Sequence, residues 1–87
     1  MFTVYVLRSD ATGRLYVGLT RDVERRVFQH NDGVTKSTKG RGPWRLVYRE
    51  ECETRSTAVR RERFLKSGQG RELLKGLLSE AERSPAG

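Results

Sequence analysis

Two short runs of strand-forming residues near the start of the chain restrict its fold most strongly. Residues 2–7 (FTVYVL) and 14–18 (RLYVG) are rich in the β-branched and aromatic side chains that favour strands. Residues 8–13 between them (RSDATG) are typical of a turn. The pattern predicts an antiparallel hairpin.

The hairpin also predicts which side chains share a face of the sheet. If Leu7 pairs with Arg14, Tyr5 lies directly opposite Tyr16. Directly paired residues project from the same face, so the two tyrosines are expected on one side of the sheet. The other side is then expected to carry Phe2, Val4, Val6, Leu15 and Val17.

The rest of the chain predicts one further strand and three helices. The expected elements are a helix from Thr20 to about Asn31, a strand at 44–49, a helix at about 54–66 and a short helix at 71–82. Thr20 is the expected N-cap of the first helix, with Asp22 in its first turn. Residues 83–87 are expected to form a disordered tail, which leaves residues 1–82 as a single domain.

The small supply of apolar residues narrows the architecture further. The chain has 87 residues, of which 34% are hydrophobic, so it can build only one small core. A three-stranded antiparallel sheet flanked by helices is the most economical packing for such a chain. The predicted fold is therefore α/β (α+β), in the order β-β-α-β-α-α.

The charge of the chain points to a polyanionic partner. Eighteen Lys and Arg against eleven Asp and Glu give a net charge of +7, which suits DNA, RNA or an anionic membrane surface. No apolar run reaches the roughly 18 residues of a membrane-spanning helix, so the membrane is set aside. Cys52 is the single cysteine, which excludes an internal disulfide and fits a reducing, cytoplasmic location. A basic domain without such a partner is the alternative.

Two groups of basic residues are candidates for phosphate contacts. One is the loop at 33–43, with Lys36, Lys39 and Arg41; the other is the outer face of the second helix, with Arg60, Arg61 and Arg63. Either group can equally be ordinary solvated charge. Trp44, which follows the loop, is expected in the core rather than stacked on a base.

Ionisable residues occupy helix positions that the apolar pattern assigns to the core. On a helical wheel, Arg26 and His30 lie beside Val23 and Val27. Glu62 lies within the apolar stripe of the second helix. That stripe is formed by Ala58, Val59, Leu65 and the stem of Lys66.

An unpaired carboxylate in apolar surroundings costs several kcal/mol, about the size of a lost buried ion pair. Three interpretations of Glu62 stay open: an internal ion pair with Arg26, a position at the helix margin that reaches water, or a polar pocket that holds a cation. His30 alone is also compatible with a satisfied buried histidine, and the tyrosines with ordinary sheet aromatics.

Together these side chains would supply what phosphodiester hydrolysis requires. A metal ion on Glu62 would polarise the phosphate, and the guanidinium of Arg26 would match its charge. A phenol or imidazole would accept the proton of the attacking water. Because a tyrosine has an ordinary pKa near 10, it needs nearby positive charge to act as a base at neutral pH.

At this point the chain resembles the GIY-YIG nucleases. Thr3-Val4-Tyr5 followed by Tyr16-Val17-Gly18 resembles their paired signature. The run from Thr20 to His30 resembles the first helix of these nucleases, and the run from Ala58 to Lys66 resembles their metal-binding helix. The resemblance covers residues 2 to about 67 and is closest to the small single-domain members of the family.

The resemblance implies a role for each of these side chains. It implies that Tyr5 acts as, or assists, the general base and that Tyr16 orients water or phosphate. It also implies Arg26 and His30 as the arginine and histidine of the helix, and Glu62 as the ligand of one divalent ion, Mg²⁺ or Mn²⁺. It also implies an α/β sandwich around a three-stranded antiparallel sheet. The chain departs from the larger relatives in having no Asn after the metal-binding helix and no separate DNA-recognition domain.

The function expected from these features is a metal-dependent DNA endonuclease or nicking enzyme, non-specific or structure-selective. DNA would be bound through its phosphates, with RNA left open. The alternative is a nucleic-acid-binding module or accessory protein that has the fold but little or no catalysis.

Overall fold

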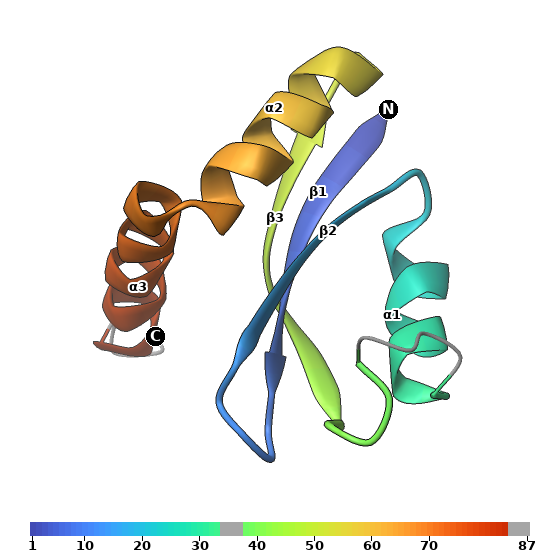
Figure 1. Ribbon diagram of the computed structural model, residues 1–87, viewed down its shortest axis with the longest axis vertical. Coiled ribbons are helices and arrows are strands. Elements are labelled where there is room, and N and C mark those ends of the chain that lie inside the picture. Colours follow the sequence, from blue (N-terminus) through green and yellow to red (C-terminus); the bar gives the residue numbers. More distant parts are fainter. Residues whose placement is uncertain (34–37, 84–87) are drawn as a thin grey trace.

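The computed structural model describes residues 1–33 and 38–83 and confirms the predicted α+β fold (Figure 1). The elements follow the expected order and are β1 (Phe2–Ser9), β2 (Leu15–Thr20), α1 (Val23–Asn31), β3 (Trp44–Cys52), α2 (Arg55–Lys66) and α3 (Gly68–Arg83). Of the tail predicted at 83–87, Arg83 is instead the last residue of α3, and residues 84–87 lie outside the described residues. Among the described residues, no helix is both long and apolar enough to cross a lipid bilayer.

The three strands form one antiparallel sheet in the order β2-β1-β3, so the first strand is central. The predicted pairing of Tyr5 with Tyr16 is wrong: Tyr5 pairs with Gly18, and Tyr16 with Leu7. The register differs by two residues, which keeps every side chain on its expected face because strand side chains alternate with period two. Tyr5 and Tyr16 therefore share a face as predicted.

The turn between β1 and β2 explains the shifted register. The side-chain oxygen of Ser9 accepts hydrogen bonds from the backbone N–H groups of Ala11 and Thr12, at 3.2 and 3.0 Å. Gly13 has φ of +74°, which glycine adopts without steric cost. The backbone N–H of Ser9 also donates to the carbonyl of Arg14, and β1 extends two residues further towards the turn than the sequence indicates.

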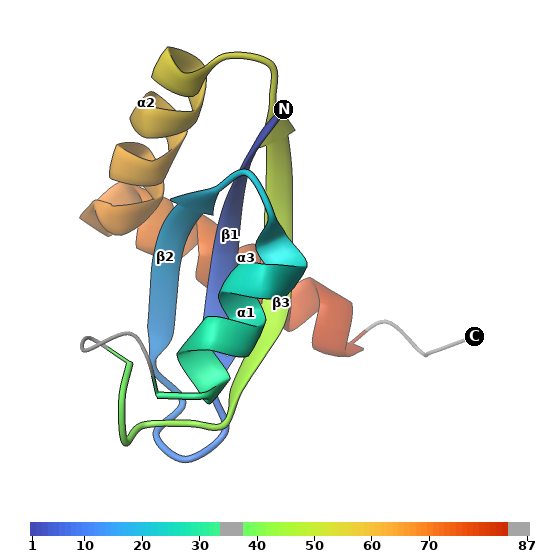
Figure 2. The ribbon, with the colours of Figure 1, turned by 90° about the vertical axis from the view of Figure 1, so that its right-hand side faces the viewer.

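Helices cover both faces of the sheet. Figures 1 and 2 show α1 on one side and α2 with α3 on the other. On the α2–α3 side the core contains Val4, Val6, Val17, Ala58, Leu65 and Leu74; on the α1 side it contains Tyr5, Leu7, Val23 and Trp44. The few apolar side chains are thus divided between two small cores, one on each face of the sheet. Buried polar side chains fill the rest of the core beneath α1.

The N-cap of α1 is Asp22 rather than the predicted Thr20. The carboxylate of Asp22 accepts a hydrogen bond of 3.1 Å from the backbone N–H of Arg25. Thr20 is still the last residue of β2, and its hydroxyl instead accepts from the N–H of Asp22 at 3.1 Å. A carboxylate at the N-cap also complements the helix dipole.

The junction of α2 and α3 is fixed by a glycine. A Cβ atom on Gly70 would overlap the carbonyl of Phe64 and lie 2.6 Å from the Cα of Leu65. The two helices therefore meet backbone to backbone at this point, with Ser67 between them as the C-cap of α2. This close approach places the start of α3 beside the end of α2, next to the hairpin.

Candidate active site

A chain of three buried polar side chains lies between α1 and the sheet. The hydroxyl of Tyr5 is 2.9 Å from Nε2 of His30, and Nδ1 of His30 is 2.8 Å from the hydroxyl of Thr38. All three residues are at most 2% exposed. His30 therefore points inward, as the helical wheel predicts, and each of its ring nitrogens has a hydrogen-bond partner.

The charge state of this chain follows from its burial. Burial, and to a smaller extent the charge of Arg26, lowers the pKa of His30 below its ordinary value. The imidazole is thus neutral at pH 7, and one ring nitrogen donates while the other accepts. When Nδ1 donates to Thr38, Nε2 accepts from Tyr5, which orients the Tyr5 proton towards the histidine.

Gly18 makes room for the tyrosine. A Cβ atom at this position would overlap the hydroxyl of Tyr5 and lie 2.5 Å from its Cζ. The phenol therefore extends directly over the backbone of β2, the strand with which Tyr5 pairs. Any larger residue at Gly18 would displace the hydroxyl that reaches His30.

Tyr16 completes an aromatic group around the histidine. The centroid of its ring lies 4.7 Å from that of His30 and 6.3 Å from that of Tyr5. The ring of Trp44 is oriented edge-on to that of Tyr16, with the centroids 6.4 Å apart. Trp44 is buried, as expected, and its indole N–H donates to the carbonyl of Thr38 at 3.0 Å.

Arg26 lies beside this group but does not dominate its electrostatics. Its guanidinium donates to the side chain of Gln29 at 3.0 Å and is half-buried. Its interaction with Tyr5 favours the phenolate, yet burial is the larger effect and raises the pKa of Tyr5 to about 12. The expected activation of Tyr5 by positive charge is therefore outweighed in the free protein, and the phenol keeps its proton at pH 7.

Glu62 approaches the same tyrosine from α2. Its charge contributes to the raised pKa of Tyr5, and its side chain is 22% exposed, neither in the core nor free in water. In the described part of the chain its ion-pair partner is Lys66, at 3.5 Å, and not Arg26. Of the three interpretations, the ion pair with Arg26 is thus not found among the described residues, Glu62 lies at the helix margin near Tyr5, and the cation site stays a prediction.

A single carboxylate is a sparse but suitable ligand for magnesium. The described residues contain no group of three His, Cys, Asp or Glu side chains that could enclose a metal ion. Mg²⁺ commonly binds through one or two carboxylates and completes its coordination with water and substrate phosphate. Glu62, half-buried and charged near Tyr5, fits that type of site.

The basic candidates differ in their surroundings. Lys39 and Arg41 are exposed in the loop, and Lys36 lies outside the described residues. Arg60 and Arg63 are exposed on α2. Arg61, in contrast, donates two hydrogen bonds to Glu50 of β3, at 2.6 and 2.8 Å, which directs its guanidinium towards the sheet.

Two residues of the site carried no assigned role in the sequence. Thr38 lies in a loop that the composition marks only as basic and polar, and no periodic pattern exists there to show that one hydroxyl points inward. Gly18 ends the YVG signature, and its role depends on the register that places it opposite Tyr5. A correct hairpin register is the signal that would have identified it.

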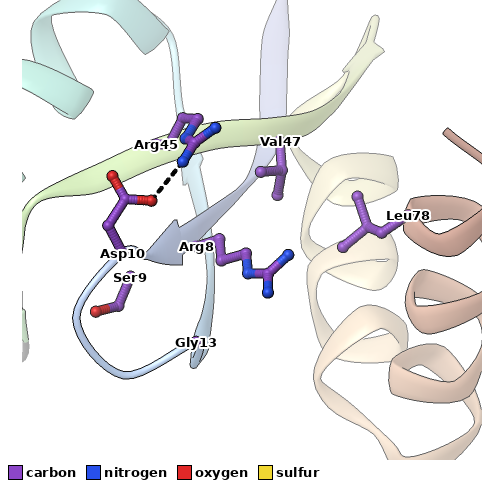
Figure 3. A pocket seen from close by; sticks show the side chains of 7 residues that line it. All are labelled: Arg8, Ser9, Asp10, Gly13, Arg45, Val47 and Leu78. Carbon is purple, nitrogen blue, oxygen red and sulfur yellow. Dashed lines mark hydrogen bonds and ion pairs between the residues drawn. The ribbon is translucent and has the colours of Figure 1, made fainter. Parts of the chain in front are cut away.

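A separate pocket lies at the far end of the sheet, between the hairpin and α3 (Figure 3). Arg8, Asp10, Arg45 and Leu78 are among its lining residues, and Arg45 pairs with Asp10 at 2.6 Å. Of the described residues that line it, none belongs to the predicted site. The chemistry is therefore concentrated around Tyr5 and His30.

The comparison with known families assigns this fold to a superfamily of nuclease domains. The model of the GIY-YIG catalytic domain family matches residues 1–75, so the chain belongs to the GIY-YIG family. This membership implies a nucleic acid as the substrate class and agrees with the resemblance of the short motifs.

The relatives are small proteins like this one. A UPF0213 protein of Staphylococcus saprophyticus is 40% identical over 78 residues, which is 88% of this chain and 93% of the relative. One of Haloquadratum walsbyi is 54% identical over 66 residues, which is 74% of this chain and 72% of the relative. The solution NMR structure of a UPF0213 protein from Bacillus halodurans has a TM-score of 0.54 and 38% identity, and the match covers 88% of this chain and 85% of that one.

Proposed function

We propose that the protein is a metal-dependent DNA endonuclease or nicking enzyme, non-specific or selective for DNA structure. The observation that carries the proposal is the buried hydrogen bond between the hydroxyl of Tyr5 and Nε2 of His30. A buried phenol with a high pKa is a poor base by itself. Bonded to a neutral imidazole, it becomes part of a proton relay.

The relay gives each side chain a defined task. A water molecule attacks the phosphorus, and the Tyr5 oxygen accepts the water proton while the phenolic proton moves to Nε2 of His30. The bond between phosphorus and the leaving oxygen breaks, and that oxygen takes a proton from solvent. Thr38 holds the imidazole in the required orientation, and the guanidinium of Arg26 stabilises charge on the phosphoryl oxygens.

Glu62 is the residue that would hold one Mg²⁺ or Mn²⁺. When bound, the ion supplies Lewis-acid polarisation of the phosphate and stabilises the leaving oxygen. The exposed cations Lys39, Arg41, Arg60 and Arg63 are proposed to contact backbone phosphates, with Lys36 a further candidate. Arg61 is the weakest member of this group because Glu50 already engages it.

The test is cleavage of supercoiled plasmid and of branched DNA with Mg²⁺ or Mn²⁺, with EDTA as the blank and RNA as a further substrate. We expect Tyr5→Phe, His30→Gln and Glu62→Gln each to slow cleavage by about 10²-fold or more, the usual contribution of a proton-transfer group. Tyr48→Phe is the matched tyrosine control, because its hydroxyl donates to Glu50 on the opposite face. Glu72→Gln is the control for Glu62, since Glu72 forms an exposed pair with Lys75.

Cleavage at the wild-type rate by Glu62→Gln would reject the metal site, and undiminished cleavage by Tyr5→Phe would reject the relay. One observation favours a second function: Glu62 is the sole carboxylate that acts on Tyr5 among the described residues. A nucleic-acid-binding module or accessory protein is that alternative. DNA binding without cleavage under all metal conditions would establish it.

A further inference from the structure

A second groove runs along the open edge of β2. It has a volume of about 670 Å³ and lies between the β1–β2 hairpin and the junction of α2 with α3. The residues that give it its character are Arg14, Tyr16, Lys66, Arg71 and Lys75. They are separated in sequence and come from three elements and a turn, which the close contact of α2 with α3 brings together.

The charge of the groove is of one sign. Of its described lining residues four are cationic and none is acidic. Lys66 and Lys75 each pair with a glutamate of their own helix, at 3.5 and 3.6 Å. Arg14 and Arg71 are exposed, and neither has an ion-pair partner within the described part of the chain.

The neighbouring pocket of Figure 3 differs from the groove in having a carboxylate among its lining residues. It adjoins the groove at Gly13, which lines both. There the guanidinium of Arg45 points at the carboxylate of Asp10, and the dashed line marks their ion pair. The groove has no such acid among its described lining residues, so its arginines retain their attraction for an anion.

The groove begins where the candidate active site ends. Tyr16 lines the groove, and its ring is tilted against that of His30 with the centroids 4.7 Å apart. Lys66 lines the groove and pairs with Glu62. The groove therefore adjoins the candidate active site at two points, Tyr16 of β2 and the Lys66–Glu62 pair of α2.

We propose that this groove binds the phosphates of an unpaired nucleic-acid strand adjoining the cleavage site, a proposal that rests on the proposed nuclease function. Proteins that bind single strands combine a cationic groove that follows the backbone with an aromatic side chain on which a base stacks. Arg14 and Arg71 supply the fixed charges and Leu15 and Leu74 the apolar floor, and Tyr16 is the one aromatic residue among the described lining residues. The preferred substrate is then DNA or RNA with a single-stranded arm.

The test is equilibrium binding in EDTA, which separates binding from cleavage. Fluorescence anisotropy is measured with labelled oligothymidine, with oligouridine and with a DNA duplex of the same length. The groove variant is Arg14→Gln/Arg71→Gln. The matched control is Arg25→Gln/Arg55→Gln, which removes the same charge from exposed positions outside the groove lining.

We expect the groove variant to bind single strands about tenfold more weakly and to lose about 1.4 from the slope of log K against log salt, which is two phosphate contacts at about 0.7 each. The control should remain near wild type. Equal losses in the two variants, or equal losses for duplex and single strand, would overturn the proposal. Comparing the affinities for oligothymidine and oligouridine shows whether the groove prefers DNA or RNA.

This outcome is independent of the cleavage assay. If the wild type never cuts DNA but the groove variant loses single-strand binding, the groove proposal stands and only the nuclease function is rejected. If the wild type cuts DNA and the groove variant binds single strands normally, the nuclease function stands and the groove proposal is rejected.

Discussion

Tyr5 reaches His30 only because Gly18 has no side chain. The replacement Gly18→Ala would place a methyl group against the phenol, and we expect it to cost about 1–3 kcal/mol of unfolding free energy, as overpacking of a core does. It should also reduce cleavage, because the hydroxyl must move. Urea denaturation measures the first effect and plasmid nicking the second.

Gly76→Ala is the internal control. Gly76 lies within α3, and a Cβ atom there meets nothing within 4 Å. This substitution should stabilise the protein by about 0.5–1 kcal/mol, since glycine is a poor helix former. If both alanines changed stability in the same direction, the close approach at Gly18 would not be the cause.

The buried His30 predicts a pH dependence of stability. Its pKa is lowered in the folded protein, so between that value and the ordinary value of about 6.5 the unfolded chain binds more protons. The unfolding free energy should therefore fall as the pH drops below about 6.5, by at most about 1.4 kcal/mol per pH unit. The loss stops below the folded pKa.

Denaturation series between about pH 7 and 5 test this, with Trp44 fluorescence as the probe. His30→Gln should show a flatter profile across that window, whatever its stability at pH 7. Glu50, whose pKa is lowered chiefly by Arg61, makes its own contribution only at more acidic pH, below its ordinary value. A profile equally steep in His30→Gln would assign the effect to another group.

For single residues, the sequence predicts which polar side chains face inward but not which partners they bond to. The helical wheel places His30 and Glu62 towards the interior because the wheel needs only the period of the helix. The partner of the Nδ1 atom of His30 is Thr38, a loop residue whose position depends on hydrogen bonds of Trp44 and Asn31. Contacts of that kind arise from tertiary packing and leave no periodic trace.

Among the elements, α2 combines two kinds of arginine. Arg61 reaches β3 and grips Glu50 with two hydrogen bonds, whereas Arg60 and Arg63 point to solvent. We expect Arg61→Gln to reduce the unfolding free energy by about 1 kcal/mol and Arg60→Gln to leave it unchanged within about 0.5 kcal/mol. Both substitutions remove one positive charge. Measuring nucleic-acid binding together with stability therefore distinguishes an arginine that stabilises the fold from one that contacts phosphate.

A double-mutant cycle with Glu50→Gln checks the origin of the effect. The coupling free energy between Arg61 and Glu50 should be favourable, and that between Arg60 and Glu50 should be close to zero. Additive losses in both cycles would mean that the geometry of the pair does not contribute to stability.

The hairpin shows why element order is easier to predict than register. Order and face follow from alternation of side chains, which survives a shift of two residues. Register depends on where the turn closes, and here the Ser9 hydroxyl and the positive φ of Gly13 close it four residues wide, at positions 10–13. The composition of RSDATG indicates a turn without fixing its length.

For the molecule as a whole, a net charge of +7 should make nucleic-acid binding strongly dependent on salt. If about four phosphates of a single strand are neutralised, affinity should fall about 50-fold between about 50 and 200 mM salt, from a slope of about 0.7 per contact. Titrations at several salt concentrations give the slope directly. A flat response would exclude phosphate contacts as the main source of affinity.

The central position of β1 has one more consequence, for the way the protein loses its activity. Tyr5 lies between β2 and β3, beneath α1 and within reach of α2, so no single outer element can detach and leave the site assembled. Fraying of the chain ends should leave turnover intact, while the heat inactivation curve should coincide with global melting. The slowest-exchanging amide protons of the molecule are then those of the strand that carries the tyrosine.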